Sequence, residues 1–392
     1  MAVSDATVSP AGATHRDDGL RRARVEEIRA LAASELLDVA GTGTRGRVNR
    51  PLLLAMARHG LLEALYPGAA TGRPQGQATA TELCCLREGL ARVSTEAETA
   101  LALQGLGGYP ILQHGGEATV QRWIPAIARG EAVAAFALSE PGAGSDAAAL
   151  SLRAERAGDR WRLFGEKLWI SNAPDADIYT IFARTTPGTG ARGVTAFALP
   201  AARSGLRGEP LELLSPHPIG RLVLDGVEVG EADVLGEVDR GFRVAMSTLD
   251  LFRPSVGAFA VGMGQAALEA ALSYTAQRHA FGGPLADQEA VAHLLADMAT
   301  ELEAARLLVV AAAAAYDAGA ERAEVTRRSA MAKLFATETA QRVVDRALQL
   351  HGARGLVQGH VLEHLYRDVR ATRIYEGASE VQRTIIARGL RP

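Results

Sequence analysis

Hydrophobic residues recur every three to four positions through most of the first third of the chain, as in GLRRARVEEIRALAASELL from Gly19 onward. This spacing predicts amphipathic helices over residues 21–131, the last of them continuing to Gly107-Gly108. Residues 1–20 are small and polar and contain no apolar signal core, so we predict a disordered lead there.

The pattern changes over residues 132–236, where short apolar runs alternate with Gly, Pro and Thr clusters. SLRAERAGDRWRLFGEKLWIS alternates in polarity on both sides of Gly158-Asp159, which is a hairpin signal. We therefore predict a middle antiparallel β domain.

Helical spacing returns over residues 237–392 in four alanine-rich segments: FRVAMSTLDLF, GAFAVGMGQAALEAALSYTAQR, AVAHLLADMATELEAARLLVVAAAAAYDAG and AEVTRRSAMAKLFATETAQRVVDRALQLHG. Four such helices with short connections predict a C-terminal four-helix bundle. The fold class is thus α+β, mainly α, with an N-terminal helical domain, a middle β domain and a C-terminal bundle.

Composition narrows the function classes. The net charge is −3, and no basic tract suggests nucleic acid. The apolar run at 307–315 is too short to span a bilayer. Cys84 and Cys85 are adjacent and cannot form a disulfide framework, so we expect a cytoplasmic protein.

Two short patterns match known motifs without their context. GTGTRG at 41–46 fits a dinucleotide-binding fingerprint, but a helical run precedes it where a strand is needed, so we predict a loop. HVLEH at 360–364 fits an inverted zinc-protease pattern, but no third ligand follows at a plausible spacing. We expect no metal.

Five further stretches carry candidate chemistry. FALSEPGAGSDAAAL (136–150) is either a turn capped by Asp146 or a loop that binds an anion or a ring. In EKLWISNAPDAD (166–177), Trp169 is either a core residue or a flat binding face. QRHAFGGPLAD and LQLHGARG are either binding segments or ordinary helix ends. Glu376 in TRIYEGASEVQR is either a functional carboxylate or a capping or solvated residue.

Taken together, these stretches resemble the acyl-CoA dehydrogenase family. LSEPGAGSD and RDVRATRIYEGASEVQRTIIAR are similar to its two signature segments, and LWISN, LDLFR, RHAFGGPLAD and QLHGARG follow the family order. The resemblance runs from about residue 25 to the C-terminus. It implies a helical domain, a β domain and a four-helix bundle, with FAD between the last two and touching a neighbour in a homotetramer or dimer.

The resemblance also implies site residues. Those expected to bind FAD are Phe136, Leu138, Ser139, Gly144, Ser145, Trp169, Ile170, Ser171, Arg278, Phe281, Gln349, Gly352, Ala353, Ala378 and Glu380. Those expected to bind the acyl-CoA substrate are Ser145, Asp250, Arg253, Tyr375 and Gly377. Arg278 and the stretch from Gln349 to Ala353 are similar to residues that contact the FAD of the adjacent subunit.

The implied reaction removes an α proton and a β hydride from a thioester, giving the trans-2-enoyl-CoA. Glu376 matches the usual catalytic base, and its amide N–H resembles a donor to the thioester carbonyl. A glutamate in an apolar pocket has a raised pKa and is a stronger base. A minority of the family places the base directly before the arginine of LDLFR, where this chain has Phe252. The expected electron acceptor is an electron-transferring flavoprotein.

The chain departs from the family pattern at four positions. Ser139, Ser171 and Ala378 stand where threonine is usual, and Glu289 where glutamine is usual near the partner's FAD. Two alternatives keep the fold: a thioester on an acyl-carrier protein, or oxygen as the electron acceptor. A third is a flavin-binding protein without turnover.

Overall fold

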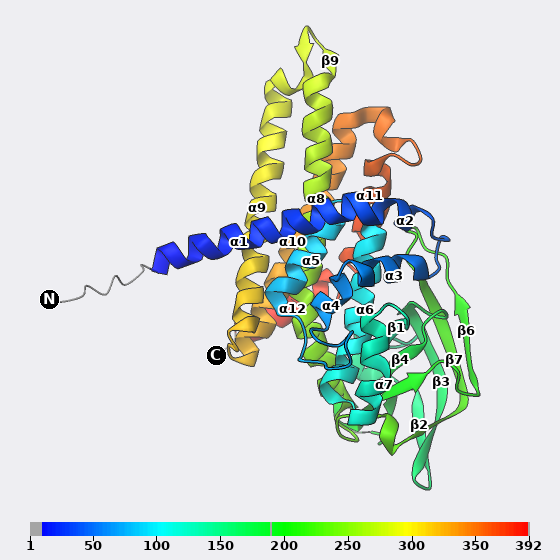
Figure 1. Cartoon of the computed structure of the whole chain (residues 1–392). Coiled ribbons are helices and arrows are strands. Elements are labelled where there is room, and N and C mark those ends of the chain that lie inside the picture. Colours follow the sequence, from blue (N-terminus) through cyan, green and yellow to red (C-terminus); the bar gives the residue numbers. More distant parts are fainter. Residues whose placement is uncertain (1–9, 189, 391–392) are drawn as a thin grey trace, which may run out of the picture.

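The protein folds into a long helical bundle, a β-sheet beside one end of it, and a set of shorter helices between the two (Figure 1). A computed structural model describes residues 10–188 and 190–390. The α+β, mainly α fold class predicted from the hydrophobic pattern is confirmed.

The N-terminal helices are α1 (Pro10–Leu31), α2 (Leu37–Gly41), α3 (Arg50–Arg58), α4 (Leu61–Leu65), α5 (Ala80–Ala91), α6 (Thr95–His114) and α7 (Glu117–Ala128), with a π-helical turn at Ala32–Leu36. The predicted disordered lead is wrong for residues 10–20, which belong to α1, whereas residues 1–9 lie outside the described chain. Asp18 pairs with Arg21 and Arg22 one turn on, and such pairs favour a helix.

Helix α6 begins where Ser94 accepts a hydrogen bond from the Ala97 amide. It then continues through Gly107, Gly108 and Pro110 to His114, beyond the predicted end. The glycines are there for packing: a Cβ on Gly107 would lie 2.5 Å from the Ala135 nitrogen. The close approach of a strand therefore explains a pair that looks like a helix end in the sequence.

The middle domain contains β1 (Ala134–Ala137), β2 (Arg153–Ala157), β3 (Arg160–Ser171), β4 (Ile178–Arg184), β5 (Val194–Pro200), β6 (Leu206–Pro210), β7 (Ile219–Gly230) and β8 (Val234–Leu235). The main path runs β6-β7-β3-β2-β4-β5-β8. The predicted hairpin is present, with Ala157 opposite Arg160. Most strand pairs are antiparallel, as predicted, and β1 is an exception that pairs in parallel with β4 after a long crossover that contains the hairpin.

The C-terminal domain contains α8 (Gly241–Gln277), α9 (Glu289–Asp317), α10 (Arg322–His351), α11 (Val361–Thr372) and α12 (Ser379–Gly389). A small hairpin of β9 (His279–Ala280) and β10 (Gly283–Pro284) joins α8 to α9. Short 3-10 turns lie at Ala147–Ala149, Gly190–Gly193, Glu231–Asp233, Leu285–Asp287 and Gly352–Leu356.

The predicted division of the bundle is wrong in one respect: its first two segments are a single helix, α8, which passes through Pro254. A proline inside a helix leaves the carbonyl four residues earlier without its N–H donor. Here the Ser329 hydroxyl of α10 donates to that carbonyl, on Asp250, at 3.3 Å. Packing against α10 thus compensates the break. Helix α8 is long and apolar enough to cross a membrane by composition, but 72% of its most apolar window is buried inside the fold.

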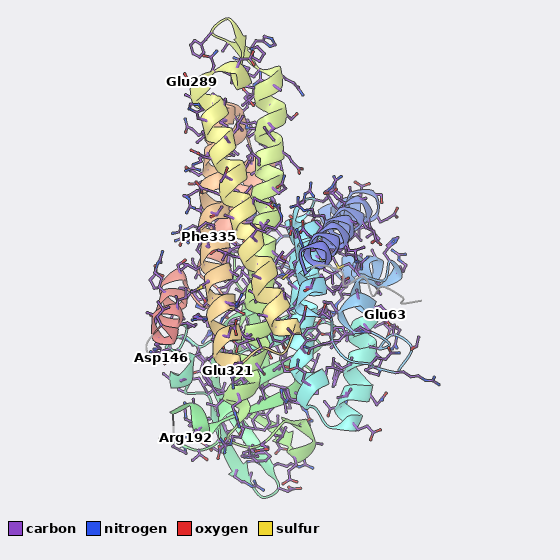
Figure 2. All side chains as sticks on the ribbon, turned by 90° about the vertical axis from the view of Figure 1, so that its left-hand side faces the viewer. Glu63, Asp146, Arg192, Glu289, Glu321 and Phe335 are labelled. Atoms are coloured by element: carbon purple, nitrogen blue, oxygen red, sulfur yellow. The ribbon has the colours of Figure 1, made fainter. Side chains whose placement is uncertain are left out.

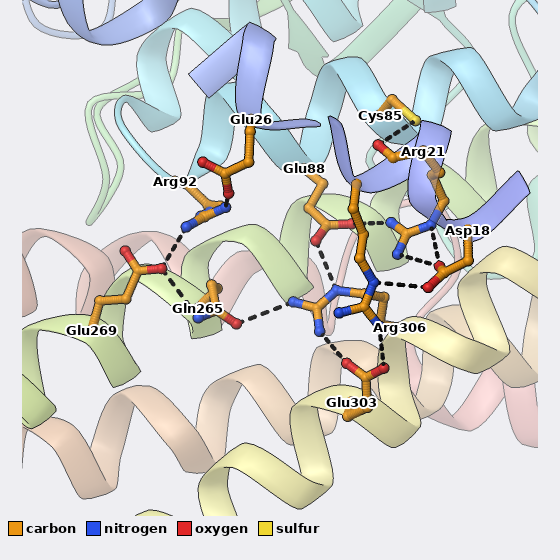
Figure 3. A network of polar contacts seen from close by, with 11 residues as sticks. Asp18, Arg21, Glu26, Cys85, Glu88, Arg92, Gln265, Glu269, Glu303 and Arg306 are labelled. Carbon is orange, nitrogen blue, oxygen red and sulfur yellow. Dashed lines mark hydrogen bonds and ion pairs between the residues drawn. The ribbon is translucent and has the colours of Figure 1, made fainter. Parts of the chain in front are cut away.

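Helix α1 crosses the bundle and is tied to it by ion pairs (Figure 3). Arg306 of α9 contacts Glu88 of α5 at 2.9 Å and Glu303 at 2.6 Å, and Glu88 also contacts Arg21 of α1 at 3.3 Å. The N-terminal helices are thereby held against the bundle, and this interface contains the buried groups described next.

Candidate active site

Glu376 lies in a turn between α11 and α12 whose backbone is strained. Its φ is 51° and that of Gly377 is 95°, a region that glycine adopts easily and glutamate does not. Gln382 Nε2 donates to the Glu376 carbonyl at 3.1 Å and to the Gly377 carbonyl at 2.9 Å. Lys333 Nζ, from α10, donates to the Gly377 carbonyl at 2.8 Å. Side chains of α10 and α12 therefore hold the turn in place.

The Glu376 carboxyl group has no ionic or hydrogen-bonding partner within the described chain, and its Oε2 is buried. Burial raises the pKa of Glu376, and Arg87, Lys333 and Arg253 oppose that rise. Few buried polar atoms in folded proteins lack a partner, so such an atom calls for a functional explanation. The group has the environment of a proton acceptor.

The neighbouring segment of α8 has no base of its own. Phe252 is fully buried and packs edge-on against Tyr109 at 5.6 Å between ring centroids. Asp250 is engaged by Arg253 at 3.1 Å and by Thr326 at 3.2 Å, and burial raises its pKa. The expected substrate residues Asp250 and Arg253 are thus each other's partners, and Arg253 also acts on the pKa of Glu376.

The loop that follows β1 is fastened at its base. Glu140 accepts hydrogen bonds from the Ser151 and Leu152 amides at 2.6 and 3.0 Å and pairs with Lys167 at 2.9 Å. Beyond that anchor, Gly144 and Ser145 are exposed. Asp146 lies at the cap position of the next turn, but its side chain makes no cap hydrogen bond. The expected capped turn is therefore not what orders this loop.

Trp169 is 53% exposed, so it is not a core residue. Its φ is 61°, at an irregularity in the pairing of β3 with β7 between Lys167 and Ile170. Such bulges re-aim side chains and are frequent beside active sites. Leu168 donates to the Ser139 carbonyl at 3.1 Å, so this strand lies directly against the loop that follows β1. Ile170 and Leu138 are buried, and Phe136 in β1 is partly buried.

Ser171 forms a hydrogen bond of 2.7 Å with Nε2 of His217, a residue that the sequence did not single out. Burial lowers the pKa of His217 to about 4, and Asp368 of α11 opposes that shift. Asp368 also acts on Tyr375, whose pKa is raised chiefly by burial.

Of the remaining expected cofactor residues, Ala378 and Glu380 lie at the start of α12, directly after the Glu376 turn, and the other five lie elsewhere. Arg278 follows α8 and Phe281 sits at the tip of the small hairpin, 91% exposed, at the end of the bundle away from the sheet (Figure 1). Tyr274 stacks on His351 at 4.3 Å, which brings the end of α10 to the same place. There Gln349, Gly352 and Ala353 are exposed. In Figure 2, Glu289 marks this distal end, whereas Asp146 and Glu321 lie toward the other.

Three family models match successive parts of the chain. They are the N-terminal domain of acyl-CoA dehydrogenase at residues 21–131, its middle domain at 135–227 and its C-terminal domain at 239–391. The chain is 33% identical to cyclohexane-1-carbonyl-CoA dehydrogenase of Geobacter metallireducens, over 93% of this chain and 95% of that protein.

The chain belongs to the acyl-CoA dehydrogenase family. It is also 36% identical to the caffeyl-CoA reductase-Etf complex subunit CarC of Acetobacterium woodii, over 87% of this chain and 90% of that protein. Its fold matches butyryl-CoA dehydrogenase from Megasphaera elsdenii with a TM-score of 0.87 and 30% identity, over 99% of this chain and all of that one. It is a flavoprotein oxidoreductase of this family.

This acyl-CoA dehydrogenase family member also has a buried ion pair that the sequence did not single out. Arg87 of α5 pairs with Glu98 of α6, and both are almost fully buried. Arg87 also donates to the Ser255 hydroxyl of α8 at 2.8 Å. Burial raises the pKa of Glu98 to about 7, against the lowering effect of Arg87. The sequence offered one signal for this pair: a charged residue at an apolar position of each of two predicted helices.

The two discarded motifs have structural roles. Gly41 ends α2, and no strand precedes GTGTRG, so it is a loop between helices. His360 caps α11 by accepting a hydrogen bond from the Leu362 amide at 3.1 Å. His364 contacts Asp368 at 3.1 Å. No cluster of side chains suited to a metal occurs in residues 10–188 and 190–390.

Proposed function

We propose that the protein oxidises a saturated acyl-CoA to its trans-2-enoyl-CoA, with Glu376 as the base that removes the α proton. The unpaired, buried Oε2 of Glu376 is the observation that carries this assignment. A base works best when its pKa approaches the working pH, and burial moves the pKa of Glu376 in that direction.

The residues present are suited to FAD. Trp169 offers an exposed aromatic face, Ser145 an exposed hydroxyl in a glycine-containing loop, and Arg278 an exposed guanidinium without an ion-pair partner in the described chain. A ring system, a polar chain and a pyrophosphate require groups of these kinds. When bound, FAD supplies the acceptor for the hydride that leaves the β carbon.

The protein's own groups act on the substrate in two ways. The Glu376 carboxylate accepts the α proton, and the enolate that results carries negative charge on the thioester oxygen. The Glu376 amide N–H makes no hydrogen bond within residues 10–188 and 190–390, and it is a suitable donor to that oxygen. Donors placed where charge develops stabilise the transition state.

The proposed partner is an electron-transferring flavoprotein, because the chain is similar to a subunit of an Etf complex. We place the protein in the cytoplasm as a homo-oligomer. Arg278 follows α8 and Gln349 lies near the end of α10, whereas Trp169 lies on β3 of the sheet, beside the other end of the bundle (Figure 1). This separation supports a site completed by a second subunit.

The decisive experiment is anaerobic mixing of the purified yellow protein with butyryl-, isobutyryl-, octanoyl- and palmitoyl-CoA while flavin absorbance is followed. Bleaching by a CoA thioester and release of the enoyl product support the proposal. Bleaching only by acyl-carrier-protein thioesters would overturn the substrate class. Rapid peroxide formation in air would identify oxygen as the acceptor, and no bleaching by any thioester would refute the activity.

A further inference from the structure

Lysine is almost absent from this chain. Of 42 basic residues, only Lys167 and Lys333 are lysines, and the side chains of both are fully buried. Each Nζ donates to a backbone carbonyl in a segment that contains expected site residues. Lys167 bonds the Leu138 carbonyl at 2.9 Å and Lys333 bonds the Gly377 carbonyl at 2.8 Å. Burying an ammonium group is costly, so its presence needs a reason.

We propose that Lys333 is a positioning residue for the catalytic base: it holds the Glu376-Gly377 turn by its carbonyl, and its charge keeps Glu376 ionised. This assignment rests on the proposed function.

The positioning role follows from the geometry of the turn. Two successive residues with positive φ form a strained segment, which persists only when its surroundings fix it. Lys333 fixes it from α10, and Gln382 fixes it from α12 by bonding the same carbonyl. These donors hold the carbonyls of the turn. The amide and the carboxyl group of Glu376 therefore remain available to the substrate.

A lysine suits this position better than an arginine. Its ammonium is a compact charge on a slim stem, whereas a guanidinium is a planar fork that needs several acceptors. Lys333 is fully buried, and within residues 10–188 and 190–390 its Nζ makes one hydrogen bond, to the Gly377 carbonyl. A single carbonyl would leave most of the guanidinium donors without partners.

The charge role follows from what faces Glu376. Arg87 of α5, Lys333 of α10 and Arg253 of α8 all favour its ionised form, against burial. Glu98 of α6 is an acidic neighbour, and the charge of Glu376 contributes to the raised pKa of Glu98. Arg87 and Arg253 have carboxylate partners of their own, in Glu98 and Asp250. Lys333 has no ion-pair partner within 4.0 Å among the described residues, so its charge is the least neutralised of the three.

Lys333 in turn faces Glu376 in the turn, Glu338 on its own helix α10, Glu380 on α12 and Arg253 on α8. Burial lowers its pKa to about 8, and Glu376 is the neighbour that opposes this most. Glu338 is engaged by the Ser379 hydroxyl at 2.7 Å and by Arg373 at 2.9 Å. Because its pKa is about 8, Lys333 remains mainly cationic at neutral pH, and Glu376 is the acidic group that interacts with it most strongly.

The test separates the hydrogen bond from the charge. Lys333→Met removes both, whereas Gln382→Leu removes two bonds to the turn and leaves the charge. Both holoenzymes are compared with wild type in the rate of flavin reduction by the fastest CoA thioester of the panel above, from pH 5 to pH 9. Melting temperature and FAD content are measured first, and Lys333→Gln carries the same test if Lys333→Met does not fold.

A second readout needs no turnover. In 3-thiaoctanoyl-CoA, sulfur replaces the β carbon, so the α proton can leave but no hydride can. The long-wavelength absorbance of the bound enolate then reports ionisation of the base as pH is varied. Removing a nearby cation raises the pKa of a carboxyl group, so the acid midpoint should move to higher pH in Lys333→Met.

We expect both variants to reduce flavin roughly 10- to 100-fold more slowly, because small displacements of reacting groups cost about that much. Only the Lys333 variants should shift the pH midpoint of enolate formation on the acid side. An unchanged midpoint in Lys333→Met, or an equal shift in Gln382→Leu, would overturn the assignment of the charge, and a wild-type rate in Lys333→Met would overturn the positioning role. If the wild type is not reduced by any thioester, the proposed function fails and this inference fails with it.

Discussion

Glu376 lies among three cations and is paired with none of them in the described chain. A glutamate that served only as a cap or a structural ion would have used one of these partners. Their arrangement instead favours its ionised form while both carboxyl oxygens stay free for a substrate proton. The alternative position for a base, Phe252, is a buried aromatic residue.

Replacing this carboxylate should abolish most of the activity. Glu376→Gln keeps the size of the side chain but cannot accept a proton, so flavin reduction by acyl-CoA should slow by about 10²–10⁴-fold, the usual contribution of a general base. Stopped-flow absorbance measures the rate. The control is Glu324→Gln, an exposed residue that pairs with Arg328 on α10. Less than about a tenfold loss in Glu376→Gln would identify another base.

The Arg87–Glu98 pair should contribute to stability through burial. Arg87→Met leaves the Glu98 carboxyl group buried without its partner, and breaking a buried pair in this way costs about 3–5 kcal/mol. Denaturant unfolding measures the loss. Arg162→Met, in a pair whose side chains are about half exposed, should cost about 1 kcal/mol or less. Equal losses in the two variants would contradict the assigned importance of burial.

Among the elements, α6 shows how glycines can belong to a helix interior. Gly107 and Gly108 weaken a helix by propensity, yet α6 continues through them because a strand and a tyrosine pack directly against their backbone. Likewise α8 continues through Pro254 because α10 supplies a donor to the carbonyl that proline leaves free. In both helices, packing between elements overrides the local preference.

A matched pair of glycine substitutions tests this packing. In Gly107→Ala the new Cβ would lie 2.5 Å from the Ala135 nitrogen, so we expect a loss of roughly 1–3 kcal/mol or more, as for overpacked cores. Gly19→Ala, also within a helix, meets nothing within 4 Å and should stabilise by up to about 1 kcal/mol. Thermal melts of both variants measure the effect, and a stabilised Gly107→Ala would refute the close contact.

In the whole molecule, the expected cofactor residues form two groups at opposite ends of the bundle. Trp169 and Ser171 lie at the sheet, and Arg278 and Gln349 lie at the distal end (Figure 1). The separation agrees with a site completed by a second copy of the chain, and we therefore predict that cofactor retention depends on assembly.

Arg278→Ala should therefore lower the FAD content of the purified protein without unfolding it, since Arg278 is exposed and makes no ion pair in the described chain. A guanidinium that pairs with pyrophosphate is a strong contact. The ratio of flavin to protein absorbance, with sedimentation to report the oligomer, measures the effect. Arg192→Ala, exposed at the opposite end (Figure 2), is the control. Full FAD content in a monomeric variant would contradict this prediction.

The sequence alone determined the three-part organisation, because the period of apolar residues reports which face of each element is buried. It also determined the β2–β3 hairpin, since Gly158-Asp159 and alternating polarity act locally. It placed Glu376 and Trp169 in candidate segments but left open whether each was exposed, capped or buried. Periodicity within one element does not contain that information.

The tertiary structure determined which side chains contact one another across the sequence. Lys333 meets Gly377 across 44 residues, Ser171 meets His217 across 46, and Arg87 meets Ser255 across 168. Each of these contacts requires two elements to pack at one particular distance and angle, and no local pattern encodes that geometry. The same packing buries Glu376 without a partner in the described chain, so the property that supports its proposed role as the base exists only in the folded chain.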